Sequence, residues 1–247
     1  MNPRFALTTA LALAFCTSVV HAAVIDFESV PGGSPSDQLA ITSQYEPLFG
    51  VTFSLSSGDS PYLEAVGGAD AGDGFVNNAL NAVDVAAPGF EPQLQGHFLR
   101  IGTTGLAAVP VPRLLISYTT PVAAASAQIW DIDGDPSATE QWQVEAFNSG
   151  GALVASLLSP LGTSYGVSSL DGKPWTWSFD RGGVADIASI SLTFVGSKTS
   201  GIGLAFDNFS PSSPAPAVPE PGALALAVAG GLTVLAWGRR QRRARMA

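Results

Sequence analysis

Three carboxylates, those of Asp131, Asp133 and Asp135, stand on alternate residues directly after a stretch that has the composition of a strand. A turn at this point would bring them toward one hard cation, and calcium takes several oxygen ligands. An EF-hand is excluded, because its loop needs Gly and Glu where this sequence has Pro136 and Trp142. The pattern is compatible with a solvated acidic turn or with a calcium site of another kind, and both interpretations stay open.

Histidine and cysteine are scarce. His97 is the one histidine beyond residue 22, so a zinc site with two histidines cannot be built from that part of the chain. It stands beside Phe98 on an expected strand, which favours a structural role. The single cysteine, Cys16, lies near the N-terminus, so the rest of the chain holds neither a disulfide nor a thiolate metal site.

Acids and aromatic rings suggest two further chemistries. A glycosidase needs two carboxyl groups roughly 5 to 10 Å apart, and the many acids of this chain leave that alternative open without singling out a pair. Trp142, Trp175 and Tyr165 could stack on sugar rings if their side chains were exposed. Trp175 and Trp177 are two residues apart on one expected strand, so their side chains point to the same face. That face is expected to pack in the core rather than to bind a sugar.

Short strands dominate the middle of the chain, and alternation of apolar and polar residues is clear in Trp142–Phe147. Asn148–Gly151 follows with the residues of a tight hairpin turn. The sequence predicts an all-β fold, a jelly-roll-like β-sandwich. The predicted strands are Val24–Phe27, Val51–Leu55, Tyr62–Val66, His97–Ile101, Leu114–Tyr118, Ala125–Asp131, Trp142–Phe147, Leu153–Leu158, Trp175–Phe179, Ser189–Val195 and Leu204–Phe209.

Charge divides the chain sharply. Residues 23–218 hold 19 Asp or Glu and five Lys or Arg, a net charge of −14, although the whole chain carries −9. A body this acidic has no basic surface to displace counterions from phosphates, so no nucleic acid partner is expected.

The first 22 residues have the three zones of a secretory signal peptide. Arg4 precedes an apolar run that ends at Val20, and a short segment ending at Ala22 suits cleavage. We expect a signal helix, cleavage after Ala22, and a β-sandwich ectodomain over residues 23–209. A retained membrane helix is the alternative, but the run is short for a bilayer.

The C-terminal region has three successive parts. Residues 210–218 repeat Pro and Ser and predict an extended linker. Residues 222–238 carry no charge, and as a transmembrane helix they would rise ~26 Å, close to the ~30 Å of a hydrocarbon core. A basic cluster follows: Arg239, Arg240, Arg242, Arg243 and Arg245. Because arginines stay on the cytoplasmic side, such a helix would leave the ectodomain outside.

Pro219, Glu220 and Pro221 stand at the edge of this helix. With the short helix and the arginines, residues 219–245 resemble the PEP-CTERM sorting signal. The resemblance implies that an exosortase, a membrane-embedded processing enzyme, recognises this tripeptide. It also implies transient anchoring in the inner membrane, then transfer to the outer envelope, cell surface or extracellular matrix. An ordinary tail anchor with a proline-rich spacer is the alternative.

The two ends of the ectodomain, Val24–Glu28 and Leu204–Phe209, resemble the first and last strands of lectin-like and carbohydrate-binding-module jelly rolls. In such folds the terminal strands meet, and an acid from each often binds a structural calcium together with loop carbonyls. By this resemblance Glu28 and Asp207 are expected calcium ligands.

We therefore expect an exported, non-enzymatic protein of the cell surface or extracellular matrix. Its expected partner is an exosortase-type membrane enzyme, exopolysaccharide is a candidate partner, and structural calcium is the candidate cofactor. Two alternatives stay open: a calcium-dependent carbohydrate-binding module, and a secreted glycosidase or other hydrolase.

Overall fold

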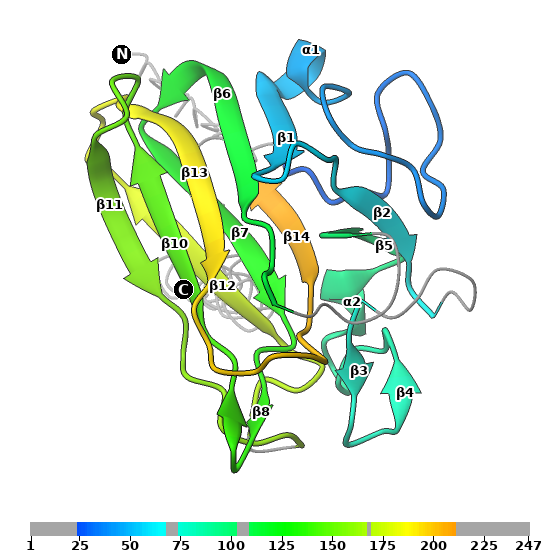
Figure 1. Cartoon of the computed structure of the whole chain (residues 1–247). Coiled ribbons are helices and arrows are strands. Elements are labelled where there is room, and N and C mark those ends of the chain that lie inside the picture. Colours follow the sequence, from blue (N-terminus) through cyan, green and yellow to red (C-terminus); the bar gives the residue numbers. More distant parts are fainter. Residues whose placement is uncertain (1–23, 68–73, 103–108, 167–168, 211–247) are drawn as a thin grey trace, which may run out of the picture.

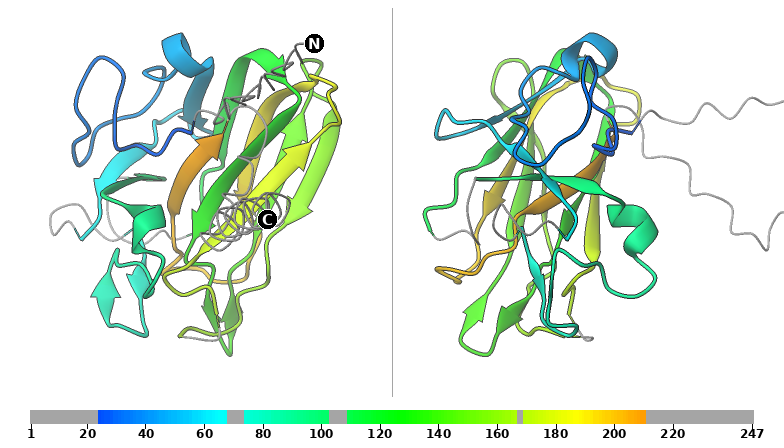
Figure 2. Two further views of the ribbon diagram at one scale, coloured as in Figure 1. Left: turned by 180° about the vertical axis from the view of Figure 1, so that it is seen from behind. Right: turned by 90° about the vertical axis from the view of Figure 1, so that its right-hand side faces the viewer.

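The computed structural model describes residues 24–67, 74–102, 109–166 and 169–210. Two five-stranded antiparallel sheets pack face to face (Figures 1 and 2), which confirms the all-β fold and the sandwich. The first sheet has the order β1 (Val51–Leu55), β6 (Leu114–Val122), β13 (Ile187–Phe194), β10 (Trp142–Phe147) and β11 (Leu153–Leu158). The second has the order β12 (Pro174–Asp180), β7 (Ala124–Trp130), β14 (Ala205–Ser210), β5 (His97–Arg100) and β2 (Tyr62–Ala65).

Short helices and hairpins lie outside these two sheets. The helices are α1 (Glu46–Phe49) and α2 (Glu91–Leu94). One hairpin pairs β3 (Val76–Asn77) with β4 (Ala82–Val83), and the other pairs β8 (Gly134–Asp135) with β9 (Ala138–Thr139). Both hairpins lie at one end of the sandwich and α1 lies at the other (Figure 1).

Ten of the eleven predicted strands are present, and β1, β10 and β11 have the predicted bounds. The exception is Val24–Phe27, where only Ile25 pairs, as an isolated antiparallel bridge with Phe209. Phe27 has a φ of 59°, in the left-handed region, so an extended strand cannot continue through it. The first and last described segments of the sandwich still meet, as the second resemblance implied.

The β10–β11 hairpin has the predicted turn chemistry. Asn148 Oδ1 accepts hydrogen bonds from the backbone N–H groups of Gly150 and Ala152, both at 3.0 Å. Gly151 has a φ of 78°, which a glycine adopts without steric cost. An Asn that bonds its own turn and a glycine at positive φ together set the hairpin register.

Alternate residues of facing strands fill the space between the sheets. Trp142, Val144 and Ala146 of β10 are fully buried, while the residues between them are half-buried. The ring of Trp142 lies edge-on to Phe206 of β14, with 5.2 Å between centroids, and so links the two sheets. Burial of a side chain of this size contributes about 3 kcal/mol. The period of two in the sequence thus identified the core face.

A second apolar cluster covers the outer face of the second sheet. Trp130 of β7 stacks on Phe75 with 6.4 Å between ring centroids, and α2 adds Leu94. Beside this cluster, Arg100 and Glu64 form an ion pair of 2.8 Å in which both side chains are 1% exposed. The segment that carries α2 therefore buries part of a sheet face that would otherwise meet water.

Within the described ranges, no helix is long and apolar enough to span a bilayer. The predicted signal helix (1–22) and transmembrane helix (222–238) lie outside those ranges.

Candidate functional site

The chain turns sharply at Asp131, directly after β7. Asp131 has a φ of 64°, a left-handed conformation that is uncommon for residues other than glycine. Two hydrogen bonds fix it: its N–H donates to the carbonyl oxygen of Lys173 at 3.1 Å, and its Oδ1 accepts from the N–H of Gly172 at 2.8 Å. The predicted turn is therefore real, and it directs the acids that follow toward one end of the sandwich.

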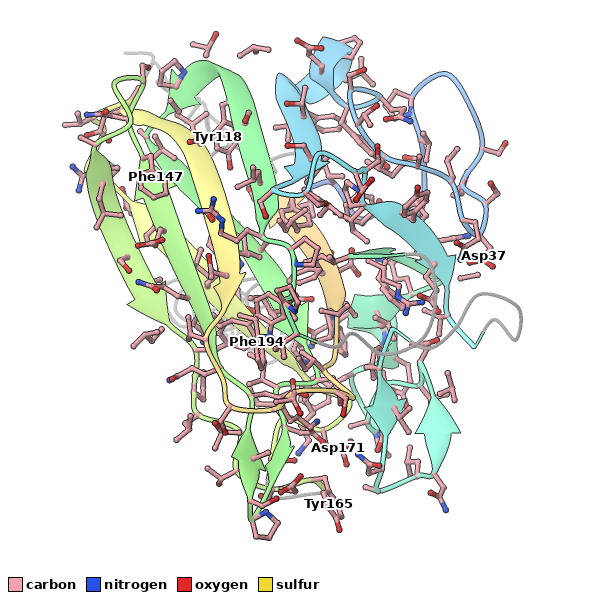
Figure 3. The ribbon with its side chains drawn as sticks, in the orientation of Figure 1. Asp37, Tyr118, Phe147, Tyr165, Asp171 and Phe194 are labelled. Carbon is pink, nitrogen blue, oxygen red and sulfur yellow. The ribbon has the colours of Figure 1, made fainter. Side chains whose placement is uncertain are left out.

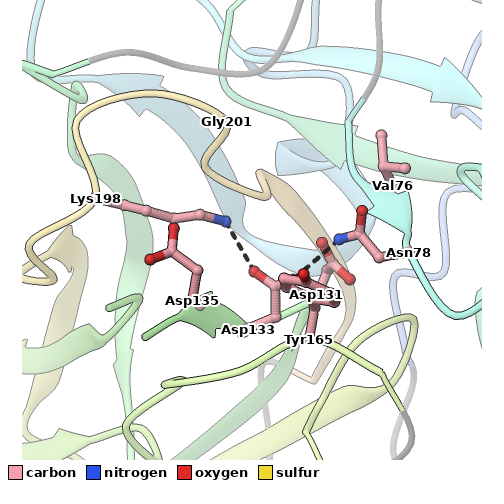
Figure 4. A pocket seen from close by; sticks show the side chains of 9 residues that line it. Val76, Asn78, Asp131, Asp133, Asp135, Tyr165, Lys198 and Gly201 are labelled. Carbon is pink, nitrogen blue, oxygen red and sulfur yellow. Dashed lines mark hydrogen bonds and ion pairs between the residues drawn. The ribbon is translucent and has the colours of Figure 1, made fainter. Parts of the chain in front are cut away.

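A pocket of about 260 Å³ opens at this end (Figure 4). Its lining comes from four separate stretches of the chain: Val76, Asn78, Asp131, Asp133, Gly134, Asp135, Tyr165, Lys198 and Gly201. Figure 3 shows Tyr165 and Asp171 at the same end of the molecule. The three acids singled out from the sequence thus line one pocket.

Lys198 lies among these acids. Its Nζ donates to Asp133 Oδ1 at 2.8 Å and to Glu140 Oε1 at 2.6 Å. Asn78 Nδ2 donates to Asp133 Oδ2 at 3.3 Å, so both oxygens of Asp133 have partners (Figure 4). The Lys198 ammonium therefore neutralises part of the negative charge of these acids.

Burial raises the pKa of the acids around Lys198. Desolvation, followed by repulsion from Asp133, holds the pKa of Asp131 well above its usual value. Burial also raises the pKa of Glu140 to about 8, although Lys198 acts in the opposite direction. Because the ion pair alone would lower that pKa, its upward shift shows that desolvation outweighs the lysine. The pocket holds more acid than one ammonium neutralises.

Asp135 is solvated and organises its own turn. Its Oδ1 accepts hydrogen bonds from the Ser137 hydroxyl at 2.6 Å, the Ser137 N–H at 2.7 Å and the Ala138 N–H at 2.9 Å. These bonds lower the pKa of Asp135. Among the described residues, no group of three or more His, Cys, Asp or Glu side chains is arranged to hold a metal ion. Asp131, Asp133 and Asp135 share a pocket without forming such a group, and calcium there stays a prediction.

Glu28 and Asp207 lie at the seam between the first segment and β14. Glu28 Oε1 accepts from the N–H groups of Gly96 at 2.8 Å and His97 at 2.7 Å. Asp207 is fully buried, and its Oδ2 has no hydrogen-bond partner. Burial, then repulsion from Asp26 and Glu28, holds the pKa of Asp207 well above its usual value. Glu28 and Asp207 therefore lie close enough for their charges to interact.

The candidate stacking residues differ in exposure. Trp142 is 0% exposed, so its assignment to ligand stacking is wrong, because β10 turns the ring into the core. Trp175 is half-buried and packs against the same core. Tyr165 is 60% exposed and lines the pocket. Tyr165 alone of the three offers most of its ring to a ligand.

A Gly-x-Ser-x-Gly spacing is present in Gly162–Gly166, the sequence GTSYG, and the prediction of candidate catalytic residues overlooked it. A nucleophile elbow stands between a strand and a helix. This segment is irregular, and within the described residues no helix follows it. His97 Nδ1 lies 3.5 Å from Glu28 Oε2, in the seam. The strand–turn–helix context that a nucleophile elbow needs is therefore not formed by the described residues around Ser164.

Four further residues of the pocket region were not predicted from the sequence: Asn78, Glu140, Asp171 and Lys198. Asp171 accepts hydrogen bonds from the N–H groups of Asn78, Ala79 and Gly166, at 2.8, 3.0 and 2.8 Å, and so holds two loops of the pocket together. These contacts join residues up to 93 positions apart, which local patterns do not reveal. The one available signal was the scarcity of basic residues, which made Lys198 conspicuous in an acidic body.

The sorting residues Pro219, Glu220 and Pro221 and the arginines from 239 to 245 lie outside the described residues. No family model matches the sequence, and no curated protein matches it either. The two resemblances therefore stay predictions.

Proposed function

We propose that this chain is an exported, non-enzymatic protein of the cell surface or extracellular matrix. A signal peptide directs export, and the tail holds the ectodomain at the inner membrane until an exosortase-type enzyme acts at Pro219-Glu220-Pro221. The observation that carries the proposal is the order of three features in residues 219–245. These are the tripeptide, an uncharged stretch over 222–238, and five arginines.

Pairing between the first and last segments of the ectodomain supports the division of the chain into signal peptide, ectodomain and tail. Ile25 and Phe209 exchange two backbone hydrogen bonds, of 2.7 and 3.0 Å. The sandwich therefore begins and ends at one pair of neighbouring positions. Cleavage before Val24 or anchoring after Ser210 would leave both sheets uninterrupted.

Jelly-roll connectivity is the finer fold that we propose for the ectodomain. Along the chain, β5, β6 and β7 alternate between the two sheets, and β12, β13 and β14 do so again. In space, β14 lies between β7 and β5, while β13 lies between β6 and β10. Interleaving of this kind is what two Greek keys produce in a jelly roll, which supports the proposal.

The hydrogen bonds of the pocket acids support a non-enzymatic role. Asp133 has partners on both oxygens, and Glu140 is fully buried. Neither acid can meet a substrate as a free base or nucleophile without losing its bonds to Lys198. The pocket is better suited to holding a ligand than to paired-acid hydrolysis.

A secreted hydrolase is the second candidate function, and one observation favours it. Asp131 and Asp135 line the same pocket, and their pKa values are shifted in opposite directions. Such a pair can divide the roles of proton donor and ionised carboxylate. The test is release of reducing ends from exopolysaccharide of the producing cells. Release that depends on Asp131 would replace the non-enzymatic assignment.

Calcium at the seam is the cofactor that we propose. The Oδ2 of Asp207 is buried without a partner, and a hard cation would satisfy it. Glu28 and backbone carbonyls would complete the site, as in the carbohydrate-binding modules that the two ends of the ectodomain resemble. A calcium-dependent binding module for exopolysaccharide is the molecular role consistent with this site.

Fractionation and mass spectrometry of the producing cells test the sorting proposal. The wild type is expected in the outer envelope or medium, shortened near Pro219. A variant with Ala at Pro219, Glu220 and Pro221 is expected intact in the inner membrane. The matched control replaces three prolines of the linker, Pro211, Pro214 and Pro216, and should be processed like the wild type. Identical intact inner-membrane forms of wild type and variant would contradict the proposal.

A further inference from the structure

The acidic pocket is unusual in its charge. Three acids line it, and two more, Glu140 and Asp171, lie directly behind, where both raise the pKa of Asp131 by repulsion. Among the described residues of the lining, Lys198 is the one basic residue. Even with Asp131 and Glu140 protonated, the carboxylates outnumber this ammonium, so an anionic ligand would be repelled.

Asp131 is a buried lining residue of the pocket with one carboxyl oxygen that no described residue bonds. The residue is 4% exposed, and its Oδ1 is occupied by the N–H of Gly172. Its Oδ2 has no hydrogen-bond partner among the described residues but is not sealed off by the protein. A Cβ at Gly203 would lie 3.1 Å from this oxygen, so the glycine keeps the approach to it free.

The ion pairs of Lys198 show that acids of this pocket region bind an ammonium group. The Lys198 ammonium lies between Asp133 and Glu140, at 2.8 and 2.6 Å, and it is the protein's own amine. The open oxygen of Asp131 lies in the same acidic field and offers a second place for an ammonium.

We propose that this pocket binds a small ligand through a primary ammonium group, such as an amino-sugar residue with a free amine. The ammonium donates to Asp131 Oδ2, in the field of Asp135, and the carbon skeleton lies against the exposed ring of Tyr165. This inference rests on the proposed function, since it assigns a ligand class to a non-enzymatic exported ectodomain.

The acids Asp133, Glu140 and Asp171 lie close enough to Asp131 to act on it electrostatically. Their negative charge adds to the attraction of a cationic ligand to Asp131 Oδ2.

Calorimetric titration of the full chain in a mild detergent tests the inference. The probes are glucosamine, N-acetylglucosamine, glucose and calcium chloride at about pH 7, below the pKa of about 8 expected for such an amine, so that the amine is charged. Glucosamine should bind. The acetylated and neutral sugars should bind at least about tenfold more weakly.

Two isosteric variants and one control complete the test. Asp131→Asn keeps the acceptor for Gly172 and should lose at least about tenfold in glucosamine affinity. Asp135→Asn should weaken binding less, and it keeps the bonds of its turn. Asp59→Asn, at an exposed loop distant in sequence, should leave binding unchanged.

Equal binding of glucose and glucosamine, calcium binding that displaces glucosamine, or affinity unaffected by both pocket variants would overturn the inference. So would absence of glucosamine binding. None of these outcomes touches the sorting proposal, which fractionation reads independently.

Discussion

Replacing Lys198 by methionine would leave the acids on either side of it buried without a cation. The ammonium contacts Asp133, which is 2% exposed, and Glu140, which is 0% exposed. Removing one partner of a buried ion pair costs about 3–5 kcal/mol, because the remaining charge is uncompensated. We expect Lys198→Met to lower the free energy of unfolding by about that amount near pH 8.

The loss in free energy of unfolding caused by Lys198→Met should be smaller at low pH. The folded-state pKa of Glu140, about 8, lies above its ordinary value of 4.5, so protonation favours the folded state. The resulting stability is fully present below the ordinary value and is lost as the pH rises through the folded-state pKa. The Lys198→Met substitution removes an interaction that lowers the pKa of Glu140, so the free energy of unfolding of the variant should depend more steeply on pH. Near pH 4.5 we expect a loss of about 1 kcal/mol.

Urea unfolding of the full chain, followed by the fluorescence of the buried tryptophans, measures both quantities. In the Lys198→Met background, Glu140→Gln should recover at least about 1 kcal/mol near pH 8, since it removes the orphaned charge. Arg181→Met is the control, because the Arg181–Asp186 pair of 3.0 Å is solvated, and little change is expected. A Lys198→Met loss below about 1 kcal/mol near pH 8, or one equal at both pH values, would refute this reasoning.

Three further predictions concern the seam, the core and the pocket loops. Chelation of calcium should lower the thermal midpoint of the wild type and leave Asp207→Asn unaffected, since a bound ion stabilises by mass action; an unchanged wild-type midpoint would reject the seam site. Trp142→Ala should cost about 3–5 kcal/mol in urea unfolding because the ring is fully buried, and a normal stability would contradict its place in the core. Gly162→Ala should destabilise the pocket loop, because its Cβ would collide with the Asp133 carbonyl oxygen, and exchange of amide hydrogens at that loop should speed up. Unaltered exchange there would show that the two segments do not lie in contact.

Local patterns were sufficient for the sheets and insufficient for the pocket. Alternation in β10 fixed which residues face the core, and Asn148 with Gly151 fixed the hairpin. Phe27 broke the first expected strand because its left-handed φ has no sequence signal in a bulky residue. The bonds from Lys198 to Asp133 and Glu140 span 65 and 58 positions, so only the folded chain brings them together.

The direction of β14 has a consequence for how the protein would stand on a surface. Its first residue, Ala205, pairs with Trp130, the residue just before Asp131, and its last is Ser210, after which the sequence continues toward the proposed sorting tail. Five residue steps at ~3.3 Å each separate the two ends of the strand by ~17 Å. If the ectodomain is anchored through its C-terminal end, the acidic pocket would lie at the end farthest from the membrane, facing the surroundings of the cell.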